Sequence, residues 1–163
     1  MANRSCPARR TALARILAAV LCVCFVGAPG LVSPVPALAA PGDFTISPIG
    51  WNVVGLDSNK VMTGPNVFSV GVRVCNTTGA LLSGSATWVW ESANAYVSLA
   101  SSATRSWDVN GGDCRSLYWT VEVARDSAAY FTSRNFHIDV TSGGVTLSTP
   151  PNRQIYVEKL VSQ

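Results

Sequence analysis

Residues 67–75 read VFSVGVRVC, and residues 114–125 read CRSLYWTVEVAR. In both stretches apolar and polar side chains alternate, which is the period of a β-strand with one face buried and the other in water. Residues 85–91 (SATWVWE) and 135–140 (NFHIDV) alternate in the same way. We therefore predict an all-β fold whose core is carried by these four strands. The predicted inward-facing residues are Phe68, Val70, Val72, Val74, Ala86, Trp88, Trp90, Leu117, Trp119, Val121, Val123, Phe136, Ile138 and Val140.

Five further stretches are interpreted as shorter or less regular strands. They are residues 51–56, 96–99, 105–109, 145–148 and 155–161. Turn-forming residues separate the strands, such as Asn-Gly-Gly-Asp at 110–113 and Ser-Gly-Gly at 142–144, and the latter predicts a hairpin. Short strands at this spacing are typical of a sandwich, so the expected fold class is an immunoglobulin-like β-sandwich of about seven to nine strands. A closed barrel is the alternative.

The N-terminal segment has the layout of a secretory signal peptide. Four arginines and no acid precede an apolar run at residues 16–28, and Ala-Leu-Ala-Ala follows at 37–40. Basic, apolar and then A-x-A is the order found in such signals, and the run is shorter than the stretch of about 20 apolar residues that crosses a membrane. We predict a signal peptide over 1–39 and an Ig-like domain over 40–163, secreted or held at the cell surface. An uncleaved membrane anchor is the alternative.

The positive charge of the chain belongs to this signal segment. The whole chain has 12 Lys and Arg, 9 Asp and Glu, and a net charge of +3. Residues 1–39 hold four of the basic residues and none of the acids, so residues 40–163 have a net charge of −1. Nucleic acid is not an expected partner, because its binding needs clustered Lys and Arg. Contact with a membrane is expected only through the signal during export.

Cys75 and Cys114 are the cysteines of the predicted domain, and we expect them to form a disulfide. Cys75 ends one predicted strand and Cys114 begins another. Two free thiols are the alternative. No metal site is expected, because His137 is the only histidine of the chain.

Immunoglobulin domains offer a partial match to this pattern. Trp88 follows Cys75 at about the spacing of the core tryptophan in those domains, and residues 126–130 (DSAAY) match a tyrosine corner. Thr132 stands where the second cysteine of that motif would be. The antibody-type cross-link between the two sheets is therefore not predicted.

The sequence offers little for catalysis. His137 lies two residues before Asp139 in a predicted strand, so the two side chains share a face and form a pair of the kind that orients a general base. No G-x-S-x-G motif accompanies them, and we predict no catalytic residue, no enzyme activity and no cofactor. Residues 55–59 (GLDSN) have one carboxylate, which is too few for Ca²⁺, and are interpreted as a turn. Asn76 begins an Asn-Thr-Thr glycosylation sequon.

Aromatic residues give the candidates for ligand binding. The five tryptophans are Trp51, Trp88, Trp90, Trp107 and Trp119. A flat ring that is exposed on a sandwich can stack on a sugar. Trp107, beside Asp108 near a turn, is the first candidate for ligand stacking, and Tyr118 is the second. The alternative is that tryptophans fill the core, and Trp88, Trp90 and Trp119 fit it best.

Several motifs in order resemble a known family. They are WNVVGLDSNK at 51–60, GPNVFSVGVRVCNTTG at 64–79, WVWESANAYVSL at 88–99, YWTVEVAR at 118–125 and STPPNRQIYVEKLVSQ at 148–163. Together these motifs resemble the Ig-like domains of bacterial secreted and cell-surface proteins, akin to the conserved-repeat group called "domain of unknown function eleven". The resemblance implies a β-sandwich in an extracellular, non-catalytic module, and it supplies no functional residues.

These observations predict a secreted, non-catalytic Ig-like module with a structural or adhesive role. A cell-surface protein or a polysaccharide is the kind of partner considered. The alternative function is a carbohydrate-binding module that uses exposed Trp or Tyr residues.

Overall fold

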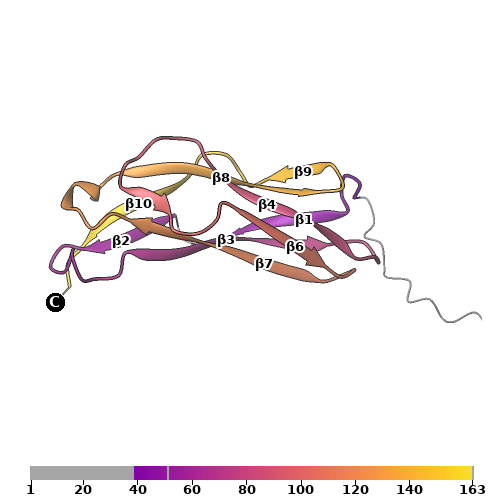
Figure 1. The fold of residues 1–163 in the computed structure, drawn as a ribbon, viewed down its shortest axis with the longest axis horizontal. Coiled ribbons are helices and arrows are strands. Elements are labelled where there is room, and N and C mark those ends of the chain that lie inside the picture. The colour runs from indigo at the N-terminus through magenta and orange to yellow at the C-terminus, as the bar shows by residue number, and fades with distance from the viewer. Residues whose placement is uncertain (1–38, 51, 163) are drawn as a thin grey trace, which may run out of the picture. The chain divides into compact units, whose positions relative to one another are not determined.

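Two β-sheets pack face to face in the computed structural model, which describes residues 39–50 and 52–162 (Figure 1). These residues lie in the compact unit Pro34–Gln163. The predicted signal peptide up to residue 38 and the residue Trp51 lie outside the described residues. The described part of the chain contains no helix long and apolar enough to cross a membrane.

One sheet has the strand order β1-β3-β7-β5, and the other has the order β2-β10-β8-β4-β6 with β9 paired to β8. The strands are β1 (Phe44–Ile49), β2 (Val53–Asp57), β3 (Val67–Asn76), β4 (Leu82–Trp90), β5 (Val97–Leu99), β6 (Thr104–Val109), β7 (Cys114–Val123), β8 (Ser133–Ser142), β9 (Val145–Ser148) and β10 (Arg153–Leu160). A short 3₁₀ helix, η1 (Ser127–Ala129), precedes β8. The fold is an all-β, Ig-like sandwich, as predicted, and the described strands do not close into a barrel.

The chain changes sheets between its first two strands. β1 pairs antiparallel with β3 as far as Ile49 opposite Gly71, whereas β2 pairs parallel with β10 in the other sheet. Gly50 connects them with a φ of +106°, and a Cβ there would lie 3.3 Å from backbone atoms of Ser69 and Val70. Glycine tolerates both the positive φ and this close approach. The crossing leaves the first residues of β3 without a strand partner on the β1 side.

The predicted alternation places one face of each long strand in the core. Its buried members include Val70, Val72, Val74, Ala86, Trp88, Leu117, Trp119, Val121, Val123, Phe136, Ile138 and Val140, whereas Phe68 and Trp90 are only partly buried. Trp88 stacks on Phe136 with ring centroids 4.1 Å apart and an interplanar angle of 6°. The ring of Trp119, from the opposite sheet, lies 6.1 Å from that of Trp88. Large aromatic rings therefore join the two sheets.

The predicted strands are all present, and their ends lie within about three residues of the predicted ones. The predicted hairpin at residues 142–144 is confirmed, because β8 and β9 pair with Ser142 opposite Val145. Gly143 and Gly144 have φ values of +54° and +88°, the signs that a two-residue type I′ turn requires. β1 was not predicted, and it contains Pro48. Proline is tolerated there because β1 is an edge strand, whose outer side needs no hydrogen-bond donor.

Cys75 and Cys114 form the predicted disulfide. The two residues lie directly opposite each other in the β3–β7 pair, and their Cα atoms are 4.0 Å apart. The bond joins neighbouring strands of one sheet, where β3 ends and β7 begins. It does not connect the two sheets through the core, so the predicted absence of an antibody-type cross-link is also confirmed.

Residues 126–130 form a capped turn and not a tyrosine corner. The side chain of Asp126 accepts a hydrogen bond from the Ala128 amide at 2.9 Å at the start of η1. The Tyr130 hydroxyl is buried and has no hydrogen-bond partner among the described residues. A tyrosine corner needs a hydrogen bond from that hydroxyl to the backbone. The DSAAY motif therefore does not have the role that it has in immunoglobulin domains.

Candidate functional site

Tyr118 lies at a hollow between β6 and β7, which we call the edge groove. Residues 104–106 and 115–118 line the edge groove, and its volume is about 430 Å³. β6 is the outermost strand of its sheet, and β5 covers β7 only from Val121 to Val123. The first half of β7 therefore has no strand neighbour on that side. The hollow forms where these two incompletely covered edges meet.

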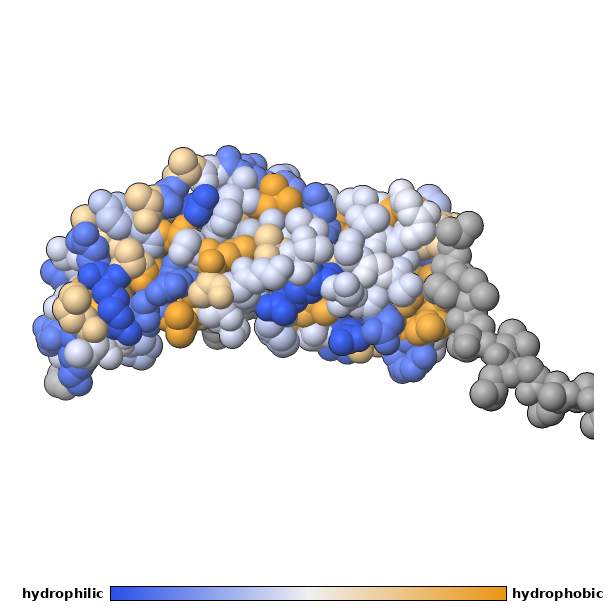
Figure 2. Space-filling view, in the orientation of Figure 1, coloured by the Kyte–Doolittle hydropathy of each residue, from blue (hydrophilic) through white to orange (hydrophobic). Residues whose placement is uncertain are grey.

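Polar groups dominate the lining of the edge groove. Its lining residues include Thr104, Ser106 and Ser116, which carry hydroxyls, and Arg105 and Arg115, which carry guanidinium groups. Figure 2 shows hydrophilic residues among pale ones on the lower side of the sandwich, where Figure 1 places β7. This lining contains many hydrogen-bond donors and acceptors and no carboxylate.

Tyr118 stands on the outer face of its sheet with 47% of its surface exposed. It lies directly opposite Gly71 on β3, and a Cβ at Gly71 would be 2.9 Å from Tyr118 Cδ1. Because Gly71 has no side chain, the tyrosine ring can lean over the neighbouring strand while its other side meets solvent. Stacking of a ligand on Tyr118 stays a prediction.

The two arginines of the edge groove differ in their partners. Arg115 Nη1 lies 2.7 Å from Asp108 Oδ1, and both side chains are exposed. Arg105 lies over the Trp119 ring, 5.8 Å from its centroid, and its Nε is buried without a partner. Within residues 39–50 and 52–162 the Arg105 side chain forms no ion pair and no hydrogen bond.

Trp107 is buried, so the prediction that it stacks on a ligand is wrong. Only 2% of its surface is exposed, and its ring centroid lies 5.8 Å from that of Phe44 in the core. Trp107 shares the inward face of β6 with Val109, two residues away. The period of the strand directs this side chain into the core even though a turn follows soon afterwards.

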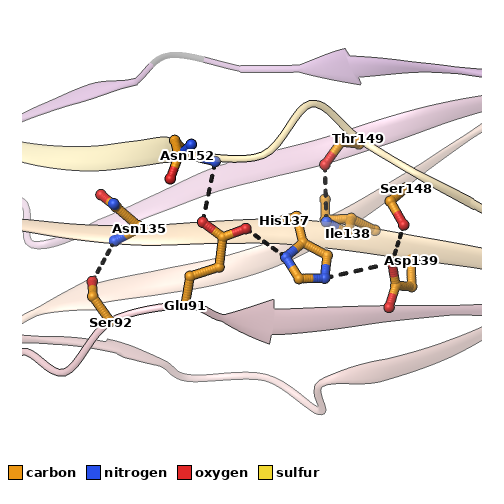
Figure 3. A network of polar contacts seen from close by, with 9 residues as sticks. All are labelled: Glu91, Ser92, Asn135, His137, Ile138, Asp139, Ser148, Thr149 and Asn152. Atoms are coloured by element: carbon orange, nitrogen blue, oxygen red, sulfur yellow. Dashed lines mark hydrogen bonds and ion pairs between the residues drawn. The ribbon is translucent and has the colours of Figure 1, made fainter.

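His137 lies on the outer face of β8 between two carboxylates (Figure 3). Its Nδ1 is 2.7 Å from Glu91 Oε1, and its Nε2 is 3.5 Å from Asp139 Oδ1. Asp139 accepts a hydrogen bond from the Ser148 hydroxyl, and Glu91 Oε2 accepts one from the Asn152 amide at 3.1 Å. The cluster connects the segment after β4 with β8, β9 and the loop before β10.

The predicted His137–Asp139 pair is present, but its surroundings are not those of an activated nucleophile. Ser148 donates its proton to Asp139 and not to the imidazole. A nucleophile and its base need a hydrogen bond to each other, and none of the described Ser, Thr or Cys side chains has one to His137. Sequence reasoning missed Glu91, because 46 residues separate it from His137 and only the strand register brings them together.

Asn76, the asparagine of the sequon, is buried and forms hydrogen bonds within the protein. Asn76 is 2% exposed, and its Nδ2 donates to the carbonyl oxygens of Ala80 at 2.6 Å and Val109 at 3.0 Å. Its Oδ1 accepts hydrogen bonds from the amide and the hydroxyl of Thr78, at 2.9 and 2.8 Å. A glycosylated asparagine has to present its amide nitrogen at the surface. In the folded protein Asn76 instead joins the ends of β3 and β6.

A second, more apolar hollow of about 500 Å³ lies between β2, the end of β10 and the start of β3. Beside it, Asp57 accepts hydrogen bonds from the backbone amides of Asn59 at 2.9 Å and Ser162 at 3.3 Å. Hydrogen bonding to the Ser162 side chain, and then to the Asn59 backbone, lowers the pKa of Asp57. A turn was predicted for residues 55–59, but residues 55–57 belong to β2 and only residues 58 and 59 turn. Among the described residues no three His, Cys, Asp or Glu side chains are placed to share a metal ion.

The comparisons with known proteins are distant. No protein-family model and no curated protein matches the chain. A FixG-related protein from Vibrio parahaemolyticus is similar in structure, with a TM-score of 0.46 and 13% identity over 72% of this chain and 98% of that one. E. coli alpha-2-macroglobulin in its native conformation has a TM-score of 0.49 and 7% identity, over 72% of this chain and 7% of its own. The secreted serine protease VesC from Vibrio cholerae has a TM-score of 0.36 and 8% identity, over 70% of this chain and 23% of its own.

Similarities this distant carry no information on function, and the chain spans only a small part of the last two proteins. The resemblance to the "domain of unknown function eleven" group stays a prediction.

Proposed function

We propose that the protein is a secreted, non-catalytic Ig-like module with a structural or adhesive role outside the cytoplasm. The observation that carries the proposal is the disulfide between Cys75 and Cys114. Such bonds form and persist in oxidising compartments and are rare in the cytosol, where thiols are kept reduced. The export-type sequence at residues 1–39 supports the same location.

The position of the disulfide strengthens this inference. Cys114 is exposed and Cys75 is only partly buried, so cellular reductants would reach the bond in the cytosol. The two cysteines are 39 residues apart, and closing a loop of that length stabilises a protein by about 4 kcal/mol in the chain-entropy model. A module that depends on this bond is suited to an oxidising exterior.

Expression of the full chain in a secreting bacterium tests the proposal. We expect the protein outside the cytoplasm, beginning at residue 40 by N-terminal sequencing, without titratable thiols, and retained on whole cells or on extracellular polysaccharide. A double Cys75→Ser, Cys114→Ser variant is the matched control for the thiol titration. Retention of the wild-type protein in the cytoplasm with two free thiols would overturn the proposal.

Carbohydrate binding is the second candidate function. The observation that favours it is the half-exposed ring of Tyr118 on the outer face of β7, above Gly71 of β3. Retention on purified polysaccharides, compared between wild type and Tyr118→Ser, tests it.

A further inference from the structure

We infer that an extended, acidic peptide segment of a partner protein adds as a strand to the free edge of β6, in the edge groove. The inference deepens the proposed function by naming the kind of partner that an exported adhesive module would hold, and it rests on that function only in this respect. β6 is the last strand of its sheet. Unpaired edges of this kind are where extended peptides add to folded domains.

Every second residue of β6 turns its main-chain groups away from β4. Just before the strand, the Ala103 carbonyl accepts a hydrogen bond from the Trp88 amide at 2.8 Å, so Ala103 faces β4. The side that the main-chain amide and carbonyl face alternates along an antiparallel strand. Thr104, Ser106 and Asp108 therefore direct their amides and carbonyls toward the free edge, where no described strand pairs with them.

Side chains occupy only the two ends of this edge. The Ser102 hydroxyl donates to the Thr104 carbonyl at 3.1 Å, and Arg115 Nη1 donates to the Asp108 carbonyl at 3.3 Å. The amide and the carbonyl of Ser106 lie between these two contacts and have no hydrogen-bond partner within residues 39–50 and 52–162. An added strand would satisfy both groups.

The other wall of the edge groove is also an unpaired main-chain edge. On the side of β7 that faces away from β3, the Thr120 carbonyl accepts from the Ala100 amide at 2.9 Å, and its amide donates to the Ser101 hydroxyl at 3.2 Å. By the same alternation, Ser116 and Tyr118 direct their main-chain groups to that side, which β5 does not reach. A peptide suits such a groove because it carries one donor and one acceptor in most residues.

Arg105 is the reason to expect an acidic side chain in the peptide. It shares the inward face of β6 with Trp107 and lines the edge groove. Its guanidinium carbon lies 5.8 Å from the centroid of the buried Trp119 ring, and its Nε is buried without a partner among the described residues. In an added strand the residue beside Arg105 faces the same way. An aspartate or glutamate at that position would bond to the guanidinium.

A second copy of this chain would not supply that acid through its own β6. If β6 of one copy paired antiparallel with β6 of another in one continuous sheet, their inward faces would have to match. Arg105 would then lie opposite an arginine, a tryptophan or a valine, because the inward face of β6 consists of Arg105, Trp107 and Val109. Asp108, the acid of β6, lies on the outer face. We therefore commit to a different protein as the partner.

The experiment is calorimetric titration of the exported, oxidised protein at low salt with four probes. The first is a peptide of alternating threonine and glutamate, which places its carboxylates on one face when extended. The second has glutamine in place of glutamate. The third has proline in place of threonine, so it keeps every carboxylate but loses the amides that would face β6. The fourth, oligogalacturonate, has carboxylates without a peptide main chain. We expect saturable binding of the first peptide, weaker by at least about tenfold for each of the others.

Variants assign the binding to the edge of β6. Arg105→Gln should weaken the threonine–glutamate peptide by about tenfold or more, since it removes a charged hydrogen bond. Arg73→Gln is the matched control, because Arg73 is exposed on the outer face of β3, and it should stay within about twofold. Ser106→Pro removes an amide that points away from β4 and should weaken binding by about tenfold, whereas Ser106→Ala keeps that amide and should stay within about twofold.

Hydrogen exchange gives a second measurement on the wild-type protein, which is decisive if Ser106→Pro does not fold. Binding of the threonine–glutamate peptide should slow exchange of the Ser106 amide by at least about tenfold, because the amide becomes hydrogen-bonded. The amide of Asn110, in the exposed turn after β6, is the control and should not change. A ligand that contacts side chains alone would leave the Ser106 amide unprotected.

Four results would overturn the inference. They are no binding of the threonine–glutamate peptide, equal binding of any of the other three probes, an affinity unchanged by Arg105→Gln, and unchanged exchange of the Ser106 amide. Equal or tighter binding of oligogalacturonate would make the ligand a saccharide. If any of these occurs while the exported, disulfide-linked protein still adheres to cells, the inference fails and the proposed function stands. Free thiols or cytoplasmic retention would instead remove the proposed function.

Discussion

Replacing Asn76 by alanine should destabilise the fold much more than a surface change would. The side chain makes two donated and two accepted hydrogen bonds in a site that is 2% exposed. The net worth of one such bond is about 0.5–1.5 kcal/mol, and a buried carbonyl left without its donor costs about 1–3 kcal/mol. The bond to the Val109 carbonyl is fully buried. We therefore expect Asn76→Ala to lower the free energy of unfolding by about 2–4 kcal/mol.

Asn76→Asp sharpens the prediction, because aspartate has almost the same size and shape. It keeps the acceptor for Thr78 but places an oxygen where Nδ2 now donates to the carbonyls of Ala80 and Val109. Two acceptors would then face each other, and a charge would be buried. We expect this variant to lose at least as much stability as Asn76→Ala.

Urea unfolding of the oxidised protein measures the effect. With a slope of about 1–3 kcal/mol per molar urea for a domain of this size, Asn76→Ala should lower the unfolding midpoint by about 1 M or more. Asn110→Ala is the matched control, because Asn110 is exposed, and it should change the free energy of unfolding by less than about 0.5 kcal/mol. If Asn76→Ala behaves like Asn110→Ala, the hydrogen-bond reasoning is wrong.

Three further predictions follow from the fold. Gly84→Ala would place a Cβ against the backbone oxygen of Thr141 on β8. This variant should lower the free energy of unfolding by at least about 2 kcal/mol in urea titrations, and a neutral result would contradict the close approach. Reducing the bond between Cys75 and Cys114 should lower the melting temperature by about 10–20 °C, and an unchanged melting curve would show that the bond adds nothing. Hydrogen bonding to Ser162 lowers the pKa of Asp57 in the folded state. The ionised Asp57 therefore stabilises the fold above the pKa that it has in the unfolded chain, and this stabilisation is lost as the pH falls through the folded-state pKa. Asp57→Asn should therefore melt lower than wild type at neutral pH and approach it in acid, and a constant difference across pH would exclude this linkage.

Most of the fold could be predicted because apolar and polar residues alternate along the long strands. β7 and β8 bury every second residue over most of their length, and β3 does so apart from the buried Gly71; this pattern can be recognised without knowing which strands pair. β1 does not show a regular alternation of buried and exposed residues. Its burial falls mostly on Phe44, and Pro48 interrupts the pattern, so only its pairing with β3 identifies it as a strand. The order of strands in the sheets also depends on contacts far apart in sequence, which local periodicity does not encode.

The candidate site was less predictable than the fold. Composition pointed to tryptophan as the exposed aromatic, yet Trp107 is in phase with the buried Val109, and of the two residues predicted to stack on a ligand Tyr118 alone is exposed. Arg105 and Arg115 belong to no sequence motif, and they lie on different strands, β6 and β7. The edge groove exists because β5 stops short along β7, and that is a property of the sheet and not of any local stretch of sequence.

The parallel pairing of β2 with β10 has a mechanical consequence. The five register pairs from Val53 to Asp57 would all be loaded together if force pulled the start of β2 away from the end of β10, because the strands would slide along each other. We expect such a pair to resist tension better than an antiparallel hairpin opened from one end, whose bonds break one after another. If β2 and β10 separated, the disulfide between Cys75 and Cys114 would prevent the chain between these two residues from being extended. Its cysteines are 39 residues apart, so the bond keeps roughly 130 Å of chain from extending, at about 3.3–3.6 Å per extended residue.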